Sequence, residues 1–94
     1  MTHSEARVTT PNASRYLQQL CKHWAHKFTV EFDPARGHID FGEAGCTLAA
    51  GEDALHLSIA APQAEMDKWE DVVARHLERF AFREELTFDW RRAA

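Results

Sequence analysis

The spacing of apolar residues changes twice along this 94-residue chain, and that change constrains the fold more than any other feature. Between Val30 and Ile59, apolar and polar residues alternate with a period of two, which is typical of strands with one buried face. On either side of this region, apolar residues recur every three or four positions, which is typical of helices with one buried face. The chain therefore combines two amphipathic helices with a run of strands.

The first helix is predicted to begin at Thr10 and Pro11, where a hydroxyl N-cap is followed by a proline at the first helical position. A short alternating strand over Glu5–Thr10 precedes it. Lysine and histidine side chains gather in the last turns of the helix, where positive charge suits the helix dipole. The apolar stripe of this helix consists of Ala13, Tyr16, Leu17, Leu20, Trp24 and Phe28.

Four strand-like segments follow the first helix, separated by turns that contain glycine, proline and acidic residues. Connections this short are typical of a meander, in which consecutive strands are antiparallel neighbours. The apolar positions of the four segments are Val30 and Phe32, Ile39 and Phe41, Cys46 and Leu48, and Leu55, Leu57 and Ile59.

A second helix is predicted to begin at Pro62, with acidic residues placed to favour its N-terminal dipole. Its apolar stripe consists of Met66, Trp69, Val72, Val73, Leu77 and Phe80. The helical period breaks at residues 81–84. A closing strand is predicted after the break, because Leu86, Phe88 and Trp90 alternate with polar residues.

These elements predict an α+β fold with the order β-α-β-β-β-β-α-β, in a single domain over residues 1–94. Strands with one apolar face need a cover, and two helices with one apolar face each need a surface to pack on. We therefore expect a single antiparallel sheet covered on one face by the two helices. The predicted shared core consists of Leu20, Trp24, Leu57, Trp69, Val73, Phe80 and Phe88.

Charge and composition argue against several kinds of partner. The formal net charge is −4, and the 11 lysine and arginine residues are interleaved with 15 acidic ones, so we expect no nucleic-acid binding. No segment approaches the ~20 apolar residues that cross a bilayer, and Met1–Glu5 lacks the basic start of a signal peptide. We therefore expect a cytoplasmic protein without a membrane partner. Cys21 and Cys46 are too few for a disulfide framework, and we expect both to be reduced.

His23 and His26 are the first candidates for chemistry. On a helix they lie about 60° apart, close enough to form half of a metal site. The alternatives are that both are solvated residues at the end of the helix, or that they contact a ligand or partner. Cys21 lies on a different side of the helical wheel from His23, so neither a Cys–His chelate nor a cysteine nucleophile is favoured.

His76 is the second candidate, because it falls in the middle of the apolar stripe of the second helix. A buried imidazole needs a hydrogen-bond partner or stays neutral with a shifted pKa. We expect His76 to be largely buried and bonded to a polar group of the first helix or of Arg83–Glu85. It is either a satisfied core histidine or a functional acid, base or ligand.

The sequence contains no motif that supports an enzyme. There is no Gly-x-Ser-x-Gly elbow, no glycine-rich phosphate loop and no His-Glu-x-x-His pair. We therefore expect a protein that is not an enzyme.

Two segments, Arg15–Lys27 and His76–Glu85, resemble the paired signatures of the bacterial domain-of-unknown-function family 2218, and the resemblance spans essentially the whole chain. Members are similar to domains found beside or fused to siderophore-interacting flavin reductases. This implies an association with iron acquisition and such a reductase as a partner. The order of elements also resembles a TATA-binding-protein-like arrangement, although the acidic balance argues against a DNA role.

Carried over to this sequence, the resemblance marks seven ligand-binding candidates, which are His23, His26, Lys27, His76, Arg79, Arg83 and Glu84. The leading hypothesis is a small accessory or binding domain, linked to iron or siderophore handling, whose two motifs hold a small ligand or a partner protein. A second hypothesis is a metal site built from His23, His26, His76 and Glu84. A third is a purely structural polar cluster that locks the helix pair.

Overall fold

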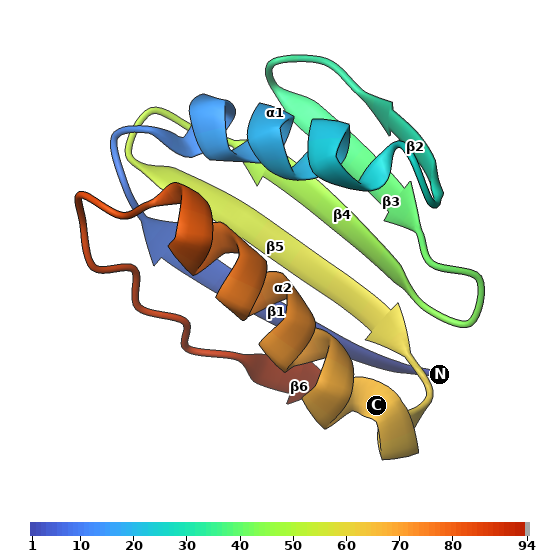
Figure 1. The fold of residues 1–94 in the computed structure, drawn as a ribbon. Coiled ribbons are helices and arrows are strands. Elements are labelled where there is room, and N and C mark those ends of the chain that lie inside the picture. The colour runs from blue at the N-terminus through green and yellow to red at the C-terminus, as the bar shows by residue number, and fades with distance from the viewer. Residues whose placement is uncertain (94) are drawn as a thin grey trace.

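The structure is a computed structural model that describes residues 1–93, and it contains one six-stranded antiparallel sheet and two helices (Figure 1). The strands lie in the order β2-β3-β4-β5-β1-β6. The predicted α+β class and the predicted order of elements are confirmed, with one short 3-10 turn, η1, added before the second helix. The elements are β1 (Thr2–Thr9), α1 (Ala13–Trp24), β2 (Thr29–Phe32), β3 (Arg36–Asp40), β4 (Gly45–Ala50), β5 (Ala54–Ala61), η1 (Gln63–Glu65), α2 (Met66–Phe80) and β6 (Arg91–Ala93).

Both helices cover the same face of the sheet, with α1 over β3 and β4 and α2 over β5 and β1 (Figure 1). The register explains this arrangement, because the buried positions of neighbouring strands lie opposite one another, as Leu48, Leu57 and Ala6 do. The predicted core is also confirmed. Leu20, Trp24, Leu57, Trp69 and Val73 are buried in one cluster, and Phe80 and Phe88 pack against it.

A glycine allows α1 to lie close to the sheet. A Cβ atom at Gly37 of β3 would stand 2.7 Å from the sulfur of Cys21, which is closer than real contacts allow. Cys21 and Cys46 are both free thiols inside the core. Burial raises the pKa of Cys21 to about 11 and that of Cys46 to about 12. Both thiols therefore stay protonated, which removes the nucleophilic form.

The predicted start of the first helix is wrong by two residues. The hydroxyl of Thr10 accepts a hydrogen bond from the backbone N–H of Asn12 at 3.1 Å, which closes a turn before the helix. The helix begins at Ala13, and Asn12 occupies the cap position without capping through its side chain. The Asn12 amide instead donates to Glu84, far away in the sequence.

The predicted closing strand is correct in its alternation but wrong in its extent. Leu86 is buried and Phe88 and Trp90 are half-buried, whereas Thr87 and Asp89 are exposed. Only Arg91–Ala93 pairs with a strand, however, opposite His3–Glu5 of β1. We refer to the irregular segment of residues 81–90 as the strap. The Phe88 and Trp90 rings stack near α2 with centroids 6.2 Å apart. The strap itself is not paired with β1, and the pairing starts only at Arg91.

No helix within residues 1–93 is long and apolar enough to span a membrane.

Replacement of Trp24 or Trp69 by alanine should lower the free energy of unfolding by about 3–5 kcal/mol, because each indole is more than nine-tenths buried in the shared core. Urea denaturation measures this change. Phe82→Ala is the control, because that ring is 79% exposed and should change stability by less than about 0.5 kcal/mol. A loss under about 1 kcal/mol at both tryptophans would contradict the shared core.

Candidate binding cleft between the two helices

Glu84 joins the two sequence motifs at one end of the helix pair. Its Oε2 atom accepts a hydrogen bond from the Asn12 amide at 2.9 Å and another from the Tyr16 hydroxyl. Asn12 stands directly before α1, and Tyr16 is on the first turns of that helix, whereas Glu84 belongs to the strap that follows α2. A single carboxylate therefore ties the end of the second motif to the start of the first helix.

The same contacts fix the charges of this cluster. The hydrogen bonds from Tyr16 and then from Asn12 hold the pKa of Glu84 below its ordinary value, so the carboxylate stays ionised. Burial, followed by the hydrogen bond to Glu84, raises the pKa of the Tyr16 phenol, so the hydroxyl keeps its proton. The donors and the acceptor are thus matched over the physiological pH range.

A cleft of about 450 Å³ lies beside this cluster. Its walls come from both motifs, with Asn12, Arg15 and Gln19 on the α1 side and Phe80, Phe82 and Arg83 on the α2 and strap side. The Arg83 guanidinium lies 5.4 Å above the Phe82 ring. Phe82 is 79% exposed, more than any other large apolar side chain among the described residues.

The two arginines of the cleft are exposed and carry no carboxylate partner among the hydrogen bonds and ion pairs of residues 1–93. The nearby carboxylate of Glu84 is already engaged by Asn12 and Tyr16. The start of α1 adds a positive helix dipole at the same place. The cleft therefore combines two free guanidinium groups with an exposed aromatic surface, which suits a small anion with an apolar body.

The predicted histidines lie together, but in a different cluster from Glu84. The rings of His23 and His76 have centroids 5.2 Å apart, and the Trp24 ring lies 4.7 Å from His76. Partial burial lowers the pKa of His23, and the positive groups of His76, Arg79, Lys27 and His26 lower it further. Four of the other six predicted residues thus lie near His23, whereas Arg83 and Glu84 belong to the cleft.

The predicted hydrogen-bond partner of His76 is wrong. The side chain is half-buried, and its Nδ1–H donates to the Val72 carbonyl at 2.7 Å on its own helix. No hydrogen bond reaches the first helix or Arg83–Glu85. The reason is geometric, because position 76 faces the rings of α1 and the nearest acceptor is the carbonyl one turn earlier.

The metal hypothesis is overturned by the same placement. Glu84 is bonded to Asn12 and Tyr16 at the start of α1, whereas His23 is in its last turn and His26 follows its end. Residues 1–93 contain no group of three or more histidine, cysteine, aspartate or glutamate side chains arranged to hold a metal ion. The four residues of that hypothesis therefore do not form one site.

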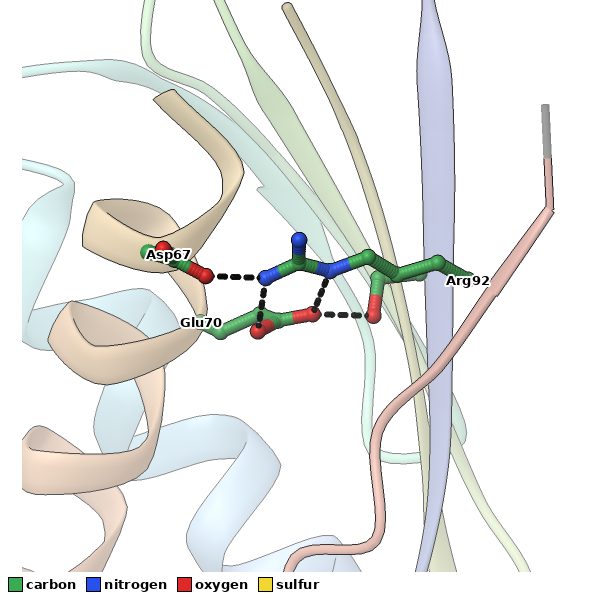
Figure 2. A network of polar contacts seen from close by, with 4 residues as sticks. Asp67, Glu70 and Arg92 are labelled. Carbon is green, nitrogen blue, oxygen red and sulfur yellow. Dashed lines mark hydrogen bonds and ion pairs between the residues drawn. The ribbon is translucent and has the colours of Figure 1, made fainter. Parts of the chain in front are cut away.

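A second polar cluster was not predicted from the sequence, and Figure 2 shows it between α2 and β6. Arg92 donates to both oxygens of Glu70, at 3.0 and 2.8 Å, and also pairs with Asp67. The buried Ser4 hydroxyl donates to Glu70 at 2.6 Å. The bonds from Arg92 and then Ser4 lower the pKa of Glu70.

One signal for this cluster was present in the sequence. Ser4 shares the apolar phase of β1 with Ala6 and Val8, and a serine at a buried position needs a hydrogen-bond partner. Arg92 likewise continues the alternation of Leu86, Phe88 and Trp90.

The match to the family model described as "Uncharacterized protein conserved in bacteria (DUF2218)" covers residues 5–91, so the chain belongs to this bacterial family. The NMR structure of PA4090 from Pseudomonas aeruginosa is similar, with a TM-score of 0.82 and 42% sequence identity over 97% of this chain and 96% of that chain. No curated protein matches the sequence. Neither matching description states an activity.

Glu84→Gln should lower the free energy of unfolding at neutral pH by about 1–2 kcal/mol, because it weakens two hydrogen bonds to a carboxylate. A carboxylate with a lowered pKa in the folded state stabilises the fold above its ordinary value of 4.5. This stabilisation is lost as the pH falls through the lower pKa of the folded state. The difference between the two proteins should therefore shrink with acidification, as measured by urea denaturation at several pH values.

Glu85→Gln is the matched control, because the neighbouring side chain is exposed and should leave stability nearly unchanged. An equal and small effect of the two substitutions would show that Glu84 is not a tie between the motifs.

Proposed function

We propose that this protein is a binding module, without catalytic activity of its own, that holds a small organic anion in the cleft between α1 and the strap. The observation that supports this most is the pair of exposed guanidinium groups, Arg15 and Arg83, that line one cleft from opposite motifs without a carboxylate partner among residues 1–93. Guanidinium groups bind carboxylate and phosphate oxygens through charge-assisted, often bidentate hydrogen bonds.

The size and walls of the cleft support the same proposal. About 450 Å³ falls within the range that small-molecule sites occupy. Phe80 and Phe82 offer an apolar surface to the body of a ligand, while the Asn12 and Gln19 amides stand beside it as polar groups. The Glu84 tie fixes the distance between the two walls.

We further propose that the ligand belongs to iron or siderophore handling, as the family resemblance implies. Ferric complexes of carboxylate siderophores carry net negative charge, so they match the guanidinium pair in sign. In this proposal the iron enters as part of the bound anion and needs no ligand from the protein. A siderophore-interacting reductase is then the protein partner to test first.

Titration of the protein with citrate, ferric citrate and benzoate, followed by calorimetry, tests the proposal. Arg15→Gln and Arg83→Gln should each weaken binding of the best of these anions by about tenfold, because each removes a charge-assisted hydrogen bond. Lys22→Gln is the matched control, since it removes one exposed positive charge from α1 outside the cleft.

Binding that weakens equally in all three variants would indicate general electrostatic attraction and contradict a specific site. A preference for benzoate over both citrate forms would keep the cleft as the site but contradict the link to iron.

A further inference from the structure

Within residues 1–93, half of the outer edge of β1 has no strand beside it. Strand β1 pairs with β5 along its whole length, from Thr2 to Thr9, but with β6 only over His3–Glu5. The Thr10 N–H donates to the Asp53 carbonyl at 2.9 Å and so continues the β5 ladder. Because successive residues of a strand direct their backbone groups to opposite neighbours, Arg7 and Thr9 direct theirs to the outer edge.

A groove of about 580 Å³ lies where the paired part of this edge ends. Arg7 and His56 line it from β1 and β5, Arg91 lines it from β6, and Asp89 lines it from the end of the strap. The Arg7 side chain makes a single long hydrogen bond, at 3.4 Å, to the Thr9 hydroxyl. Asp89 pairs with Arg91 at 3.2 Å, but both side chains are exposed, so this pair contributes little stability.

The existing register indicates which segment completes the edge. His3 lies opposite Ala93 and Glu5 opposite Arg91. If the same register continues beyond Glu5 and Arg91, Asp89 lies opposite Arg7 and Thr87 lies opposite Thr9. An acid then faces a base, and a threonine faces a threonine, and both are favourable cross-strand pairs.

The residues between these pairs also fit. Trp90 would lie opposite Ala6 and Phe88 opposite Val8, which are buried on the helix side of β1. Phe88 and Trp90 already stand near α2, so the closure changes no side chain from one face of the sheet to the other. An aromatic ring opposite Val8 is again a favourable pair.

We propose that Thr87–Trp90 closes onto β1 and extends β6 to Thr87–Ala93, and that the structure described here is the open form. The chain is anchored on either side of Thr87–Trp90, by Glu84 at the cleft and by Arg92 on Glu70 (Figure 2). Closure therefore needs no anchor to break. It gives the Arg7 and Thr9 backbone groups their partners and brings Asp89, which lines the groove, opposite Arg7.

NMR spectroscopy of the intact protein tests this proposal. Facing residues of non-hydrogen-bonded pairs bring their Hα atoms close together, so nuclear Overhauser effects are expected between Ala6 and Trp90 and between Val8 and Phe88. The amides of Arg7 and Thr9 should exchange with solvent at least about tenfold more slowly than unpaired edge amides. Asp89→Lys should reduce this protection, and the combination with Arg7→Asp should restore it.

Glu52→Lys provides the matched control, because it makes the same charge change in an exposed turn. Absence of the two Overhauser effects together with unprotected amides would overturn the proposal. Protection that increases with protein concentration would also overturn it, because a second copy would then cover the edge.

Discussion

The ring of Phe41 is the contact on which the arrangement of both helices depends. Phe41 follows β3 and is buried, with the Trp24 ring of α1 against it edge-on at 5.0 Å and the Trp69 ring of α2 stacked on it at 4.4 Å. Aromatic contacts of this kind add to the stabilisation from burial alone. Because one ring contacts both helices, it couples the position of α1 on the sheet to that of α2 at the end of the helix pair away from the cleft.

Two polar contacts add to the stabilisation that the aromatic core provides. The core holds the two helices, but the strap after α2 has little regular structure of its own. Glu84 fastens its beginning to Asn12 and Tyr16, and Arg92, just beyond its end, is fastened to Glu70 and Asp67. The first tie also determines the chemistry of the cleft, because it engages the nearby carboxylate and leaves the guanidinium groups of Arg15 and Arg83 without an acidic partner in the described part of the chain.

The sequence was sufficient for features that follow from local periodicity. The faces of both helices, the meander and the core around Trp24 and Trp69 were all predicted, because a buried face repeats every two or every 3.6 residues. It was insufficient where the outcome depends on distant partners. The Asn12 amide bonds to Glu84 across 72 positions, and Ser4 bonds to Glu70 across 66, so neither pairing leaves a periodic trace. The position of His76 predicted a hydrogen bond to the first helix or to Arg83–Glu85. Its ring does contact α1, but its hydrogen bond stays within α2.

Arg15 and Arg83 should act together on one anion, and NMR spectra that resolve the Nε–H signals of the arginine side chains test this directly. During a titration with benzoate, the signals of Arg15 and Arg83 should shift together and saturate with the same dissociation constant. The signals of Arg36 and Arg75, which lie outside the cleft, should stay unchanged. Shifts of similar size in all four arginines that never saturate would contradict a shared anion site, because they would show screening of surface charge and no bound anion.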